Sequence, residues 1–179
     1  MSGQGSGSGT PLNLIGPYAP APVAPLEDPP LAEEIAAVAA TYPTKQAALL
    51  PALHKVQRKY GHISPEAQAF VARVLELPPA HVQGAVTFYT LFRTRPMGRH
   101  HIQVCRTLSC ALAGNEDMIE YLKKKLGIGP GEVTSDGRFS LVLVECLGAC
   151  GYAPMFQVND DYLENLTPEK VDALLEAMK

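Results

Sequence analysis

The chain has 179 residues, of which 46% are apolar and 18% charged, which is enough for one ordinary domain or two small ones. Its formal net charge of -3 argues against a nucleic-acid partner, because phosphate recognition requires clustered Lys and Arg. The basic run at positions 123–125 is expected at the solvated end of a helix. No apolar run approaches the roughly 20 residues that a membrane-spanning helix needs, so we expect no direct membrane contact.

Residues 1–30 differ in composition from the rest of the chain. Of these, 15 are Gly, Ser or Pro, and the only charged residues are Glu27 and Asp28. No apolar segment follows a basic start, so the stretch does not match a signal peptide. This composition predicts a flexible tail.

The next stretch, from Leu31 to about Phe92, has helical periodicity. Ser64 and Pro65 form an N-terminal cap, and Pro51 is expected to bend the early turns of its helix. The predicted helices span about 31–42, 49–60, 64–75 and 79–89. Together they predict a small helical bundle, to which we assign no chemistry.

After Pro96 the pattern changes to mixed strands and helices. The predicted strands are 101–104, 139–144, 155–158 and 162–166, and the predicted helices are 115–126 and 168–178. The last two strands form a hairpin across positions 159–161. We describe the order as β-α-β-β-α, which is a thioredoxin-like layout. The chain is therefore predicted to be an α+β protein with three parts: a tail (1–30), a helical bundle (31–95) and a thioredoxin-like domain (96–179).

Two groups of residues are not interpreted as sites. The glycine-rich stretch at 127–131 follows a helix and contains a proline, so it is predicted to be a helix-ending turn and not a nucleotide site. The five histidines are scattered and are expected on the surface: His54, His62, His81, His100 and His101.

The four cysteines carry the strongest chemical signal. They occur as Cys105-x4-Cys110 and Cys146-x3-Cys150, with 35 residues between the inner two. A 2Fe-2S cluster takes four thiolates, two for each iron, and the chain supplies that number with none left over. Gly148 lies between the second pair and permits close backbone approach. This pattern predicts a binuclear iron-sulfur site and hence an electron carrier.

Two other uses of the cysteines stay open at this point. Tetrahedral zinc also accepts four cysteines, although these spacings suit zinc ribbons poorly. A disulfide framework is disfavoured, because four cysteines in 179 residues are few and nothing marks the chain as secreted.

A family resemblance rests on the two cysteine pairs together with two longer motifs. These are Gly84-Ala85-Val86-Thr87-Phe88-Tyr89 in the helical part and the stretch from Glu145 to Pro154, which contains the second pair. Residues 31–179 resemble the 24 kDa (E) subunit family of proton-translocating NADH:quinone oxidoreductase, respiratory complex I.

The resemblance implies a thioredoxin-like ferredoxin domain that binds one 2Fe-2S cluster through Cys105, Cys110, Cys146 and Cys150. It also implies two partners: the F subunit, which holds FMN and the NADH site, and the G subunit, which is rich in 2Fe-2S and 4Fe-4S clusters. The chain would exchange single electrons with FMN and would not oxidise NADH alone. Its implied location is the cytoplasmic face of the bacterial inner membrane, where the complex would hold it.

Other functions compete with this interpretation. The related diaphorase parts of NAD-reducing hydrogenases and NAD-linked formate dehydrogenases use a similar subunit. A stand-alone thioredoxin-like ferredoxin would need only residues 97–179, so the helical half favours docking onto a larger assembly. A structural zinc protein is the weakest alternative.

Overall fold

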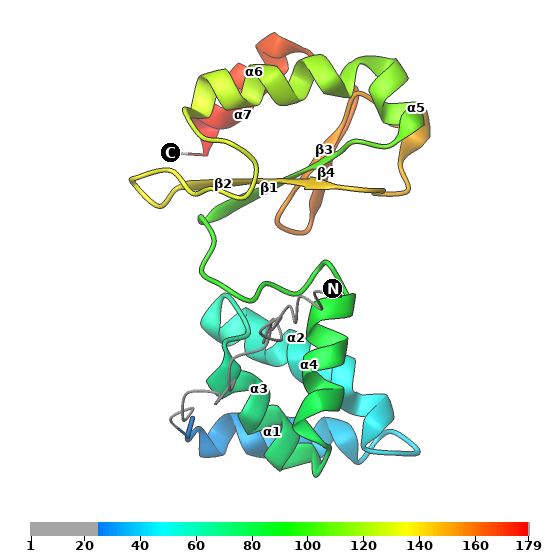
Figure 1. Ribbon diagram of the computed structural model, residues 1–179, viewed down its shortest axis with the longest axis vertical. Helices are drawn as coiled ribbons and strands as arrows, with labels where there is room; N and C mark the ends of the chain where they lie inside the picture. Colours follow the sequence, from blue (N-terminus) through cyan, green and yellow to red (C-terminus); the bar gives the residue numbers. More distant parts are fainter. Residues whose placement is uncertain (1–24, 179) are drawn as a thin grey trace, which may run out of the picture.

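The computed structural model describes residues 25–178 and places them in two lobes, one helical and one built on a sheet (Figure 1). The predicted tail falls mostly on residues 1–24, which lie outside the described part of the chain. Within residues 25–178, no helix is long and apolar enough to cross a membrane. The domain boundaries at 30/31 and 95/96 stay a prediction.

The helical lobe confirms the four predicted helices. They are α1 (Pro29–Ala39), α2 (Leu49–Tyr60), α3 (Pro65–Leu75) and α4 (Pro79–Phe88), with the short 3-10 helix η1 (Gln46–Ala48) before α2. The side chain of Asp28 accepts a hydrogen bond from the Leu31 amide, so α1 starts before Leu31, the start that periodicity predicts. Helix α2 continues through Pro51 without interruption, because Pro51 lies in its first turn, where a missing N–H group costs little.

Apolar side chains from all four helices form the core of this lobe. Ile35, Leu53, Val56 and Val71 are fully buried there, and Phe70 is nearly so. These residues recur at helical spacing in the sequence, which is why the periodicity predicted this half well.

The second lobe is built on a four-stranded mixed sheet, which confirms the predicted α+β class. Its strands are β1 (His100–Cys105), β2 (Phe139–Val144), β3 (Phe156–Val158) and β4 (Asp161–Leu163), in the order β2-β1-β3-β4. Strand β1 is parallel to β2 and antiparallel to β3, and β3 pairs with β4 as the predicted hairpin. Because that hairpin contributes two short strands, the full order is β-α-β-β-β-α.

Two helices, α6 (Glu116–Leu126) and α7 (Pro168–Ala177), cover one face of the sheet, and the helical lobe lies toward the other face (Figure 1). Leu122 and Val171 are buried against Ile102 and Leu141 of the sheet. Helix α6 ends at Gly127, which adopts a left-handed conformation, so the stretch that begins there ends a helix as predicted.

The prediction that all five histidines lie on the surface is wrong for His101. Only 4% of its surface is exposed, and its Nδ1 atom lies 2.8 Å from the Ser140 hydroxyl oxygen. Burial, together with the positive charge of Arg93, lowers the pKa of His101 to about 4. The strand pattern did not reveal this burial, because His101 lies between two strands that are both covered.

We expect His101 to make the protein less stable in mild acid. The unfolded chain takes up a proton near pH 6.5, whereas the folded chain resists it until about pH 4, so the free energy of unfolding falls as the pH drops through this range. The loss from this residue is on the order of 2–3 kcal/mol. In urea unfolding at pH 7 and pH 4.5, His101→Gln should lose less stability than the wild type. The exposed His81→Gln should match the wild type, and equal losses in all three proteins would contradict the assignment.

Candidate metal centre

The two cysteine pairs are brought together by the parallel strands β1 and β2. Cys105 is the last residue of β1 and pairs with Val144, the last residue of β2. The chain reaches Cys146 two residues later. Because the carboxyl ends of parallel strands meet at one edge of a sheet, both cysteine loops start at the same edge.

The second cysteine of each pair lies on a short helical segment. Cys110 ends α5 (Leu108–Cys110), which continues into a π-helical turn, η2 (Ala111–Asn115). Cys150 begins the 3-10 helix η3 (Cys150–Tyr152). The sequence pattern predicts a helix only from Asn115, so it misses the segment that holds Cys110. The helical turns of that segment are too short to show a periodic pattern.

The site is asymmetric in its exposure to solvent. Cys105 and Cys110 are 1% and 2% exposed, whereas Cys146 and Cys150 are exposed. Met155 is fully buried against the first pair, and partly buried Leu147 packs there as well. One pair of thiols therefore lies in an apolar setting and the other lies at the surface.

The thiols of the first pair have opposite pKa shifts. Burial opposes ionisation of Cys105, but hydrogen bonds from Thr107 and from the Cys110 thiol outweigh it, so the pKa of Cys105 falls below its usual value. Burial raises the pKa of Cys110 to about 12, and the charges of Cys105, Cys150 and Cys146 add to this shift. All four sulfurs are therefore close enough to repel one another as thiolates, and a bound cation would offset that repulsion.

Hydrogen-bond donors reach one sulfur in each loop. The Thr107 hydroxyl oxygen lies 3.0 Å from the Cys105 Sγ atom, and the Gly148 amide donates to Cys146 Sγ at 3.3 Å. Gly148 has a φ of 74°, a conformation that a side chain would strain. Donors of this kind stabilise a negatively charged sulfur and so suit a thiolate-bound iron centre.

The donor set fits a 2Fe-2S cluster by number, chemistry and setting. In residues 25–178, however, no three His, Cys, Asp or Glu side chains form a ready metal-binding group. The structure thus places the two loops beside each other without arranging three or more ligands around one point. The ligand assignment of the four cysteines stays a prediction.

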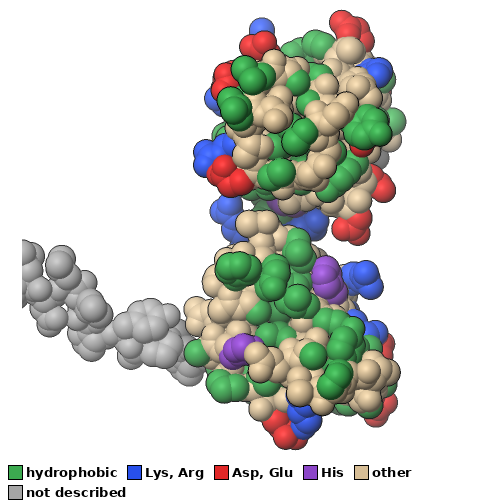
Figure 2. All heavy atoms as spheres, turned by 90° about the vertical axis from the view of Figure 1, so that its right-hand side faces the viewer, with side chains coloured by type: hydrophobic (Ala, Val, Ile, Leu, Met, Phe, Trp, Pro, Cys, Tyr) green, Lys and Arg blue, Asp and Glu red, His purple; other side chains and the backbone are tan. Residues whose placement is uncertain are grey.

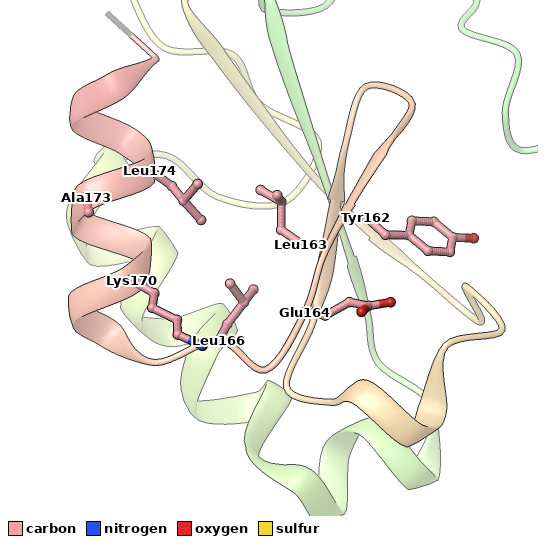
Figure 3. Close-up of a pocket in the computed structure, with 7 residues that line it drawn as sticks. All are labelled: Tyr162, Leu163, Glu164, Leu166, Lys170, Ala173 and Leu174. Carbon is pink, nitrogen blue, oxygen red and sulfur yellow. The ribbon is translucent and has the colours of Figure 1, made fainter.

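Tyr162 of β4 supports the second loop, and the sequence did not single it out. Its hydroxyl donates to the Leu147 carbonyl oxygen at 2.7 Å. Figure 3 shows Tyr162 pointing away from the space where Leu163, Leu166 and Leu174 meet between β4 and α7. That cavity, of about 450 Å³, has no cysteine in its lining, so we do not regard it as the functional site.

Charged residues flank the cysteine loops. Arg106 and Glu145, which follow and precede ligand candidates, form an exposed ion pair across the two loops. Cys146 also lines a polar cleft of about 670 Å³ between the lobes, together with Arg58, Arg93 and Arg99. Figure 2 shows Lys and Arg side chains at this narrow waist.

Comparison with protein families identifies the fold and its cofactor class. The family described as thioredoxin-like [2Fe-2S] ferredoxin matches residues 35–179, a range that contains all four cysteines. The chain belongs to this family. The resemblance inferred from the cysteine motifs is therefore confirmed.

Named relatives agree with this membership. The chain is 47% identical over 147 residues to the E 2 subunit of the NADH-quinone oxidoreductase of Rhizobium meliloti, covering 82% of this chain and 88% of the relative. It is 47% identical over 143 residues to NADH-quinone oxidoreductase subunit 2 of Thermus thermophilus, covering 78% and 79%. Among solved structures, an NAD+-reducing [NiFe]-hydrogenase matches 73% of this chain with 28% identity and a TM-score of 0.64. This chain spans only 22% of that hydrogenase chain.

Removing one of the candidate ligands should prevent normal cluster loading. In Cys105→Ala or Cys150→Ala, three thiolates remain where a 2Fe-2S cluster takes four. Iron and acid-labile sulfide per chain should fall well below the wild-type values. Ser109→Ala, a change in the same loop as Cys105, should load normally. A fully loaded and spectroscopically unchanged cysteine variant would refute the assignment of that residue.

Proposed function

We propose that the chain is the E-type electron-transfer subunit of an NADH:quinone oxidoreductase. It binds one 2Fe-2S cluster through Cys105, Cys110, Cys146 and Cys150, and it exchanges single electrons with FMN on the NADH-binding F subunit. The observation that carries this proposal is the family match over residues 35–179, supported by relatives named as subunits of this oxidoreductase.

The residues of this chain have a limited task in that reaction. The bound cluster exchanges one electron at a time. Cys105 and Cys110 hold it from the apolar side, and the donors at Thr107 and Gly148 stabilise charge on sulfur. Hydride transfer from NADH requires a two-electron acceptor such as a flavin, so we expect no NADH oxidation by this chain alone.

An exposed apolar rim around the cysteine loops supports docking of a partner. Leu108, Leu112 and Tyr152 are 74%, 81% and 54% exposed, and each lies within two residues of Cys110 or Cys150. Large apolar side chains gathered at one edge mark a protein interface. We propose that this rim docks on the F subunit, because electron exchange requires the two cofactors to lie close together.

The rest of the assembly is proposed from the same family membership. We expect the G subunit to be a further neighbour in the peripheral arm, and the complex to hold the chain at the cytoplasmic face of the bacterial inner membrane. We further propose that residues 31–95 and 96–179 act as separate domains within it. Their cores support this division, since the buried apolar residues of the two lobes form distinct clusters.

The hydrogenase match favours one alternative. The chain could serve as the equivalent diaphorase subunit of an NAD-reducing hydrogenase, since that structure shares the fold at 28% identity. The higher identity of 47% to relatives named as NADH-quinone oxidoreductase subunits favours the first proposal. The subunits that co-purify with the chain would distinguish the two.

The cluster assignment predicts a specific spectroscopic result. Anaerobically purified protein should contain iron and acid-labile sulfide in equal amounts. An S = 1/2 EPR signal should appear only after reduction, because one of two coupled ferric ions then becomes ferrous. If dithionite leaves the protein silent, a mediated titration to lower potential decides whether the cluster is only hard to reduce. Protein without sulfide that holds tightly bound zinc would overturn the proposal.

The docking rim predicts a selective loss of assembly. A charge at Leu108 or Leu112 would have to be buried against the partner, so Leu108→Asp and Leu112→Asp should each weaken binding to the F subunit about tenfold or more. Val133→Asp is the matched control, because Val133 is also apolar and exposed but lies near the start of β2, away from the cysteine loops. Binding is measured by titration of the purified subunits. Equal affinity in all three variants would contradict the assignment of this rim.

A further inference from the structure

Asn115 is the most completely hydrogen-bonded buried side chain near the cysteines, and none of its surface is exposed. Its Nδ2 atom donates to the carbonyl oxygen of Cys105 and to that of Met155, both at 2.9 Å. Its Oδ1 atom accepts a hydrogen bond from the Met155 amide, also at 2.9 Å. One carboxamide therefore binds the main chain of a candidate ligand and of a second segment.

The position of these bonds explains their purpose in the sheet. Strands β1 and β3 pair as far as Val104 and Phe156, and the next residues along, Cys105 and Met155, do not pair with each other. The Asn115 side chain lies between them and satisfies groups that a continued ladder would have satisfied. The strands can thus separate at the cysteine edge without leaving buried polar groups unpaired.

Asn115 also connects the segments that carry the cysteines. It ends η2, the turn that follows Cys110, and it binds the main chain of Cys105 directly. Met155 follows the loop of Cys150 and is buried against Cys105 and Cys110. A shift of this one side chain would therefore alter the spacing between the first cysteine pair and the chain that leaves the second.

Asparagine is suited to this position by its chemistry. It offers two N–H donors and one acceptor in a single rigid plane, and the structure uses all three. An ionised aspartate would set an oxygen against two carbonyl oxygens, and a serine hydroxyl has only one proton to donate.

We propose that Asn115 is a positioning residue that sets the spacing of the two cysteine loops and thereby controls the retention and the electronic properties of the cluster. This inference rests on the proposed function. It assigns to Asn115 more than the satisfaction of buried polar groups, because its partners are a candidate ligand and the floor of the site.

The test compares Asn115→Ser and Asn115→Asp with Ser140→Ala in the full chain. Ser140 is the matched control: it is 1% exposed and its hydroxyl contacts His101, near the start of β2 and away from Cys146. Three properties are measured: thermal unfolding, release of iron to a ferrous chelator, and the EPR g values with the midpoint potential. All three variants should lose thermal stability. The Asn115 variants should also release iron roughly 10- to 100-fold faster than the wild type and show shifted g values and potential. Ser140→Ala should retain the wild-type values for these cluster properties.

Each other outcome has a definite meaning. If the Asn115 variants release iron and give spectra as Ser140→Ala does, the residue is only a structural one and the inference is wrong. If both fail to fold while Ser140→Ala folds, Asn115 serves folding and not loop placement, which also overturns the inference. A wild-type protein without iron and sulfide would instead defeat the proposed function, so the two failures are distinguishable.

Discussion

The parallel pairing of β1 and β2 is the constraint on which the candidate site depends. A parallel pair needs a crossover, and here α5, η2 and α6 supply it, so 33 residues separate Cys105 from the start of β2 at Phe139. The result is geometric, because two segments far apart in sequence end at one edge. The antiparallel hairpin of β3 and β4 then adds Tyr162, which holds the second loop from the side.

The two sides of the site differ in what they provide. The first cysteine pair is buried among apolar residues and receives support from Thr107 and Asn115. The second pair is exposed and is bounded by a glycine-rich loop. Burial keeps water from one side, and exposure leaves the other open to a partner. An electron carrier requires both conditions, since its cofactor must be held firmly and yet be approached closely.

Sequence reasoning predicted the features that repeat or that carry rare chemistry. Helical periodicity located α1 to α4, and the cysteine spacing located the candidate site, because each signal is contained within a few turns or a single loop. It failed where the environment is set by distant residues. The burial of His101 depends on the strands at either side, and the role of Asn115 depends on Met155, 40 residues away. A polar residue at a helix start has no pattern that reveals a partner at such a distance.

The difference in exposure between the two cysteine pairs gives the site a direction. A reagent that comes from solution, whether an iron donor, an oxidant or an alkylating agent, meets Cys146 and Cys150 before Cys105 and Cys110. The raised pKa of Cys110 adds a chemical difference to this steric one, since its proton must leave before it can bind a metal. Assembly and damage therefore share one entrance, and a partner docked over the exposed pair would close it to both.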